Sequence, residues 1–169
     1  MDVFDAVRTV LAVRRYADRP VSAALVHRIV EAGRLTASSM NRQPWHFVVV
    51  EERDNLRKLG AATRSGPYVA DAALAIVVAV EKASAFAISD VSRAIQSMVL
   101  TAWAEGVGSN WAGFGGLDEV QAMLGVPAEL DVLAVLPFGY PVDPGGRGKK
   151  QRKPLGQVAH RERYGQPFE

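Results

Sequence analysis

Apolar residues recur three and four positions apart in several stretches of the chain, which is the spacing of one helix face. This spacing predicts helices over residues 1–13, from Ser22 to Leu35 and over residues 53–62. The longest helix is expected to be capped by Ser89-Asp90 and to stop at Gly106. A last helix is expected from Asp118 to Gly125. The chain therefore begins with two helices before any strand.

Four stretches have the composition of β-strands. Trp45 to Val50 is rich in Val and aromatic residues, and Ala72 to Val80 is apolar without interruption, as expected for a strand buried on both faces. A short strand is expected from Ser109 to Phe114 and a buried one from Asp131 to Phe138. The predicted order is ααβαβαβαβ, followed by an aperiodic tail from Gly139.

Length and composition indicate one globular domain, residues 1–169. The chain has 169 residues, of which 49% are apolar, enough to bury a core. It has no cysteine, which excludes disulfides, thiol nucleophiles and Cys-ligated clusters, so redox chemistry needs a bound cofactor. The longest apolar run, Ala72 to Val80, is too short for a membrane span, and no signal-peptide pattern begins the chain. We therefore expect a cytoplasmic protein with no membrane partner.

Basic residues are concentrated near the C-terminus. Residues 1–140 contain 13 Lys and Arg against 15 Asp and Glu, whereas residues 141–169 contain 7 against 3. This extended basic tail should lie along another surface instead of folding on itself. Because it lacks interleaved aromatic residues, nucleic acid is the weaker choice of partner.

Several common site motifs are missing from the sequence. The three histidines, His27, His46 and His160, form no HExxH pair and have no carboxylates clustered around them, so a zinc or iron site is not expected. The stretch GGRGK at 145–149 lacks the preceding glycine of a P-loop, because Asp143 occupies that position. No GxSxG elbow for a nucleophilic serine is present.

One segment does carry a specific motif. Residues 37–47, ASSMNRQPWHF, resemble the signature of the FMN-dependent nitroreductase family, and a Val-rich strand follows as it does there. Residues 13–21 resemble the end of that family's basic N-terminal motif, and residues 90–104 are similar to its central helix. Residues 111–114 and 150–155 resemble its flavin-facing turn and its basic C-terminal motif. The resemblance covers nearly the whole chain.

The resemblance implies a fold and an assembly. The expected fold class is α+β, a nitroreductase-like α/β/α sandwich with a central, mostly antiparallel sheet flanked by helices. The expected assembly is a homodimer in which the extended C-terminal tail, residues 141–169, wraps the partner subunit. One FMN would lie in each of two clefts at the dimer interface.

The same resemblance implies cofactor ligands. Lys150 and Arg152 would bind the FMN phosphate, since alternate residues of an extended tail point the same way and the arginine fork fits phosphate oxygens. Arg14 would lie near N1 and O2 of the flavin, where negative charge builds on reduction. The backbone N–H groups of Ala112 and Gly113 would face N5, with glycine allowing close approach. No side chain is expected to be catalytic, because the flavin carries the chemistry.

The partner subunit would complete the site. In the family, residues at the positions of Ser38, Ser39 and Asn41 come from the second chain and hydrogen-bond the flavin. The family also places a basic residue where this chain has Leu11, so one phosphate ligand is missing. Such a loss weakens binding by roughly ten- to a hundredfold. The family's longer insertion after the strand ending at Val80 is also reduced here to about eight residues, which predicts an open pocket.

These features predict an FMN-dependent oxidoreductase that reduces nitroaromatic, quinone or similar acceptors with NAD(P)H in two hydride-transfer stages. Two alternatives stay open. The chain could bind flavin or a deazaflavin without turnover, which the apolar residue at Leu11 favours. It could instead be a non-catalytic dimer whose basic tail binds nucleic acid.

Overall fold

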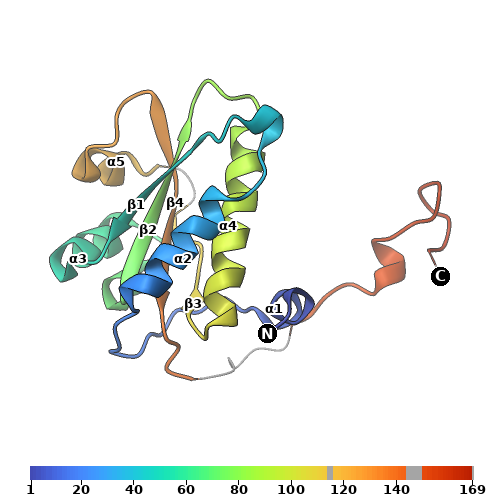
Figure 1. Cartoon of the computed structure of the whole chain (residues 1–169), viewed down its shortest axis with the longest axis horizontal. Coiled ribbons are helices and arrows are strands. Elements are labelled where there is room, and N and C mark those ends of the chain that lie inside the picture. The colour runs from blue at the N-terminus through green and yellow to red at the C-terminus, as the bar shows by residue number, and fades with distance from the viewer. Residues whose placement is uncertain (114–115, 144–149, 169) are drawn as a thin grey trace.

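The computed structural model describes residues 1–113, 116–143 and 150–168. The helices and strands alternate in the order predicted from the sequence pattern (Figure 1). In chain order the elements are α1 (Val3–Thr9), α2 (Ala23–Arg34), η1 (Ser39–Asn41), β1 (Trp45–Val50), α3 (Arg53–Ala62), η2 (Pro67–Asp71), β2 (Leu74–Glu81), α4 (Ala87–Ala104), β3 (Gly108–Ser109), α5 (Asp118–Leu124), β4 (Leu130–Gly139) and η3 (Leu155–Gln157).

The four strands form one antiparallel sheet in the order β1-β2-β4-β3. Strand β2 lies inside the sheet, with Trp45 opposite Val80 on one side and Leu74 opposite Phe138 on the other. Residues 74–80 of β2 are buried, as expected for an apolar run covered on both faces. The predicted mostly antiparallel sheet is confirmed.

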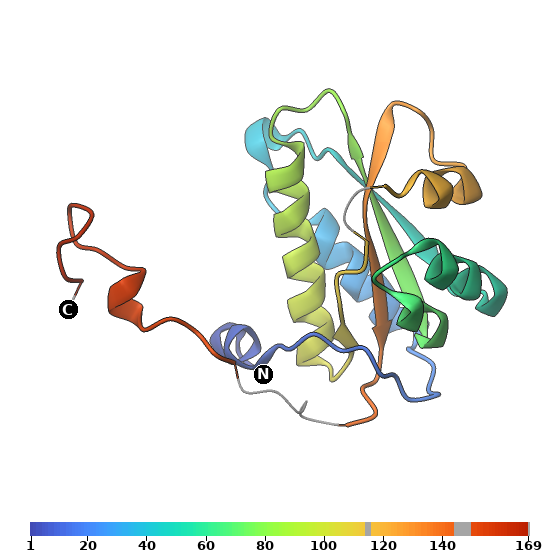
Figure 2. The same ribbon diagram turned by 180° about the vertical axis from the view of Figure 1, so that it is seen from behind.

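Helices cover both faces of the sheet, so the predicted α/β/α sandwich is confirmed (Figures 1 and 2). Side chains alternate between the faces along each strand. Ile76 and Val78 of β2 pack with α2 and α4, whereas Val77 packs with α3 and α5. Two apolar cores therefore lie on opposite sides of one sheet.

Helix α4 is the longest helix, and its buried side follows helical spacing through Val91, Ala94, Met98 and Ala102. It begins at Ala87, before the predicted Ser89-Asp90 cap, and no side chain caps it. That prediction was wrong because the Asp90 carboxylate is fully buried and accepts hydrogen bonds from another segment.

The first helix is shorter than its apolar spacing predicts. Helix α1 stops at Thr9, and the following residues run beside β3, with a parallel bridge between Ala12 and Ser109. The Val13 N–H donates to the Ser109 carbonyl at 2.9 Å. The edge of β3 thus binds the backbone that would have continued the helix. This contact brings residues 10–13 against the 109–113 turn.

The strand predicted from Ser109 to Phe114 is also shorter. Regular pairing covers only Gly108 and Ser109, and Ala112 forms an isolated bridge with Val135. Phe114 lies outside the described residues.

The described tail, residues 150–168, extends away from the sandwich (Figures 1 and 2). It forms the single turn η3, and His160 pairs with Pro167 in an isolated bridge. Several apolar side chains on it are exposed, among them Leu155 and Val158. An extended tail is therefore observed, whereas its contact with a partner stays a prediction.

None of the helices in the described parts of the chain is both long and apolar enough to cross a bilayer.

Gly108 lets residues 10–13 approach β3, and its replacement should loosen this contact. A Cβ at Gly108 would lie 2.8 Å from the Cβ of Val13, which is itself buried. We expect Gly108→Ala to lower the free energy of unfolding by about 1–3 kcal/mol through overpacking. Gly156→Ala in the tail meets open space and is the matched control. Urea denaturation measures both, and equal stability of the two variants would contradict this packing.

Candidate functional site

A small cavity of about 220 Å³ lies where three segments meet. Leu11 and Ala12 come from the stretch after α1, Gln96 comes from α4, and residues 109–111 complete the lining. The bridge between Ala12 and Ser109 fixes the first and third segments side by side. Two of the segments that resemble flavin-binding motifs are thus brought together although about 100 residues separate them.

Ser109, one of the residues around this cavity, has a hydroxyl that is unpaired within the described parts of the chain. The residue is 5% exposed, and its hydroxyl has no hydrogen-bond partner among the described residues. A buried polar group without a partner costs about 1–3 kcal/mol. The hydroxyl oxygen is itself covered by protein atoms, so among the residues that the structure describes it stays unpaired in this conformation.

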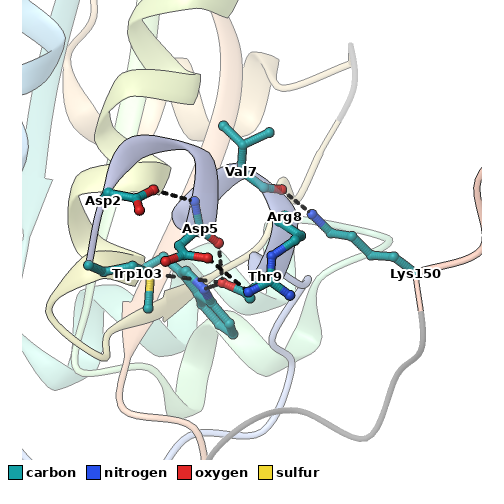
Figure 3. A network of polar contacts seen from close by, with 8 residues as sticks. Asp2, Asp5, Val7, Arg8, Thr9, Trp103 and Lys150 are labelled. Atoms are coloured by element: carbon teal, nitrogen blue, oxygen red, sulfur yellow. Dashed lines mark hydrogen bonds and ion pairs between the residues drawn. The ribbon is translucent and has the colours of Figure 1, made fainter. Parts of the chain in front are cut away.

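Lys150 lies close to the same region, at the end of α1. Figure 3 shows its ammonium donating a hydrogen bond to the Val7 carbonyl, one of the carbonyls that the end of a helix leaves unpaired. Burial, and then the nearby charge of Arg152, lowers the pKa of Lys150. Arg152 itself is exposed and donates to the carbonyl of Gln151. The two predicted phosphate ligands, Lys150 and Arg152, therefore lie at the beginning of the described tail, next to α1.

A polar network fixes α1 against α4 (Figure 3). The Trp103 indole N–H donates to the Thr9 hydroxyl at 2.9 Å, and that hydroxyl donates to the Asp5 carbonyl at 2.6 Å. Asp2 accepts the Asp5 N–H at 2.8 Å and caps the helix. The position of α1, and with it the position of Lys150, is thus set by the last turn of α4.

Arg14 does not line the small cavity. It is exposed and lines a separate polar hollow of about 470 Å³ together with Arg53 and Asp71. Tyr16 also borders this hollow, and its hydroxyl donates to the Val13 carbonyl at 2.7 Å. Burial first, then Tyr68, raises the pKa of Tyr16 well above its ordinary value, so the phenol stays neutral.

The backbone N–H groups predicted to be open to a ligand have partners within the chain. The Ala112 N–H donates to the Val135 carbonyl at 2.9 Å because this residue extends the sheet edge. The Gly113 N–H lies 3.3 Å from the hydroxyl of Ser65, which is exposed. Gly113 has φ of +73°, which favours glycine. Of the two N–H groups, only that of Gly113 has an exposed side chain as its partner.

The loop containing Ser38, Ser39 and Asn41 lies elsewhere, at the start of α4. Ser39 is bonded to Asp90 in the first turn of α4, whereas Thr9 is bonded to Trp103 in its last turn. At 1.5 Å per residue these positions are about 20 Å apart along the helix. The loop residues also do not line the small cavity. A single chain therefore does not gather all the predicted ligands around one cleft.

Two of the three predicted loop ligands already have partners. The Ser38 hydroxyl accepts the Gln43 N–H at 2.9 Å, and the Ser39 hydroxyl donates to Asp90 at 3.1 Å. Asn41 is exposed. Sequence reasoning interpreted Asp90 as a helix cap and missed its contact with the loop. The sequence did contain a sign of this contact, because Asp90 lies one turn before Ala94, on the apolar side of the predicted helix, where a carboxylate needs a partner.

His46 and the described carboxylates do not form a metal centre. His46 is exposed, and its Nε2 lies 3.8 Å from the Glu81 carboxylate. Within residues 1–113, 116–143 and 150–168, no group of three or more His, Cys, Asp or Glu side chains could hold a metal ion.

The structure is thus an antiparallel sheet between two helical layers, with a small cavity beside its longest helix. The nitroreductase family model matches residues 8–81 and 62–140, so the chain belongs to the nitroreductase family. The matched segments include the loop 37–47, the end of α1 and the 109–113 turn. The predicted family is thereby confirmed.

Named relatives agree with this assignment. A protein of Methanothermobacter thermautotrophicus that carries the name NADH dehydrogenase/NAD(P)H nitroreductase is 34% identical over 156 residues, 87% of this chain and 82% of that protein. A crystal structure from Parabacteroides distasonis with the same name has a TM-score of 0.88 and 27% identity, covering 96% of this chain and 98% of that one. A Desulfovibrio desulfuricans protein described as a nitroreductase, solved in complex with FMN, has a TM-score of 0.81 and 29% identity over 97% of this chain and 98% of that one.

The unpaired hydroxyl of Ser109 has a measurable consequence for the protein without ligand. We expect Ser109→Ala to leave the free energy of unfolding unchanged or to raise it, because the variant removes a buried polar group without a partner. Ser97→Ala on α4 is the control, since the Ser97 hydroxyl is bonded to Thr36 at 2.8 Å and to the Arg93 carbonyl at 3.1 Å. The control should lose about 1 kcal/mol in urea denaturation. A similar loss in Ser109→Ala would mean that its hydroxyl already has a partner.

Proposed function

We propose that this chain is an FMN-dependent oxidoreductase that reduces nitroaromatic, quinone or similar acceptors with NAD(P)H. The observation that carries the proposal is that residues 10–12, α4 and residues 109–111 meet around one cavity. It lies between two segments that the family match includes. The FMN complex of the Desulfovibrio desulfuricans relative supports the same cofactor here.

The side chains around the cavity suit FMN. A flavin needs cations for its phosphate, hydrogen-bond partners for its polar edge and an apolar surface for its ring. Trp111 and Leu11 line the cavity and would provide the apolar surface, while Lys150 and Arg152, which lie outside the lining at the start of the described tail, would provide the cations. When bound, FMN supplies the hydride chemistry between NAD(P)H and the acceptor.

A second copy of the chain would complete this site. The loop 38–41 lies about 20 Å along α4 from the Lys150 end, so it can reach a shared cofactor only from another subunit. Apolar side chains are exposed to solvent at both ends of the molecule, and contact with another subunit would bury them. They include Val3 and Phe4 of α1, Phe86 and Ile88 near the start of α4, and Leu155 and Val158 of the tail. These features favour a homodimer whose tail wraps the partner.

The chain's own residues would act by position and charge. Arg14 is exposed beside the separate hollow of Arg53 and Asp71, so it would meet the flavin's pyrimidine edge, where reduction concentrates negative charge, only if the ring extends from the small cavity to that hollow. Ser38 and Asn41 of the partner would hold the polar edge of the ring. The turn between β2 and α4 is only residues 82–86, which leaves room for acceptors of different shapes. No protein nucleophile or acid is needed in this scheme.

One observation favours a second candidate, a family member that binds flavin or a deazaflavin without turning it over. Val10 and Leu11 line the cavity with apolar side chains at the position where the resemblance places a basic phosphate ligand. The loss of one charge-assisted bond reduces affinity by roughly ten- to a hundredfold. The cytoplasmic location expected from the sequence stays a prediction in either case.

The absorption spectrum distinguishes the two candidates. We expect freshly purified protein, supplemented with FMN, to show the flavin's absorption bands in the blue region of the visible spectrum. Under anaerobic conditions these bands should bleach when NADH or NADPH is added. The bands should return when a nitroaromatic or quinone is added. Flavin that binds but does not bleach would favour the binding protein over the enzyme. Protein that no flavin reconstitutes would overturn both.

The proposed role of Arg152 as a ligand of the FMN phosphate can be tested by removing its positive charge. Arg152→Ala should weaken FMN binding roughly ten- to a hundredfold, because a charge-assisted bond to the phosphate is lost. Arg161→Ala is the control, since Arg161 lies on the same tail but outside residues 150–155, the segment that resembles the basic C-terminal motif. Quenching of FMN fluorescence measures both affinities. If the two variants retain flavin equally, Arg152 is not a phosphate ligand.

A further inference from the structure

The loop between Ser38 and Gln43 has an unusual backbone. Met40, Asn41 and Gln43 have φ values of 54°, 54° and 52°, in the left-handed region that residues other than glycine rarely adopt. Each such residue costs of the order of 1 kcal/mol and persists only where surrounding contacts hold it. Three of them in four residues mean that something must hold this loop in place.

Asp90 provides the strongest contact to the loop. It is 0% exposed and is the only charged side chain among the fully buried residues that the structure describes. Its carboxylate accepts the Ser39 N–H at 3.0 and 3.1 Å and the Ser39 hydroxyl at 3.1 Å. The guanidinium of Arg93, one turn further along α4, also donates to it.

The position of Asp90 strengthens these bonds. It lies in the first turn of the 18-residue α4, where the helix dipole favours a negative charge. Hydrogen bonds to a charged acceptor are roughly twice as strong as neutral ones. Ala94 and Met98, which follow on the same buried side, pack α4 onto the sheet. The carboxylate therefore joins a strained loop to a rigid part of the core.

We propose that Asp90 is a positioning residue that holds residues 38–43 in the conformation that presents Ser38 and Asn41 to the flavin of the partner subunit. This inference rests on the proposed function. It also assigns a different role to Ser39, whose N–H and O–H groups both point to Asp90. Ser39 is the attachment point of the loop. Asn41 is exposed, and the Ser38 hydroxyl, which accepts the Gln43 N–H, still has its own proton to donate to the ligand.

The first test needs no flavin. In the full-length protein, Asp90→Asn replaces the charged acceptor by an amide and should raise the hydrogen-exchange rate of the Ser39 N–H at least tenfold, measured by NMR. Asp54→Asn is the matched control, because Asp54 pairs with Arg57 at the same i,i+3 spacing on α3 but is 83% exposed. The control should leave Ser39 exchange within twofold of the unmodified protein. Unchanged exchange in Asp90→Asn would overturn the proposal.

The second test uses FMN affinity. Asp90→Asn should weaken FMN binding roughly tenfold or more, with Asp54→Asn unaffected. Ser39→Ala keeps Asp90 and removes one donor, so it serves where Asp90→Asn does not fold. Ser39→Ala should raise exchange of the Asn41 and Gln43 amides and weaken FMN binding more modestly.

A double-variant cycle separates anchoring from direct contact. If Ser39 acts through Asp90, the double variant binds FMN no more weakly than Asp90→Asn alone, because both changes remove one contact. If the double variant instead loses FMN affinity by the product of the two single losses, Ser39 contacts the ligand directly and the assignment is overturned. Faster exchange without weaker FMN binding would also overturn it. Protein that binds no FMN at all would refute the proposed function, while the exchange measurement would still decide whether Asp90 holds the loop.

Discussion

The packing of helix α4 against the sheet and against α2 is the interaction on which the rest of the structure depends. Its buried side chains join one apolar core, which also contains residues of β2, β4 and α2. Both segments of the candidate site are attached to its ends, the loop through Asp90 and α1 through Trp103. A rigid helix therefore sets the distance between them.

That distance has a consequence for how the protein works. Segments held at opposite ends of one helix cannot approach one another in a single chain, whatever their side chains are. In the homodimer proposed above, a two-fold arrangement would bring the loop of one copy to the cavity of the other without changing either fold. The exposed apolar side chains of α1, of the start of α4 and of the tail are the surface that such an arrangement would cover. Function and assembly would then have the same physical origin.

Two buried polar residues illustrate how this fold treats polar groups. Asp90 is fully buried and accepts several donors, so its burial stabilises one loop conformation. Ser109 is nearly as buried, but its hydroxyl has no hydrogen-bond partner among the described residues. The first residue stabilises the scaffold that shapes the candidate site, whereas the second leaves a buried polar group unpaired, which costs about 1–3 kcal/mol.

The sequence by itself determined the family, the order of elements and most of their bounds, because periodicity and motifs are local properties. Residues 45–50 and 53–62 have the predicted limits, and the motif at 37–47 indicated the loop. Only the tertiary structure decided that α1 stops at Thr9, that Ala112 pairs with Val135 and that Asp90 holds Ser39. Each of these depends on a contact between residues far apart in the chain, where a backbone or side-chain partner outcompetes the local preference.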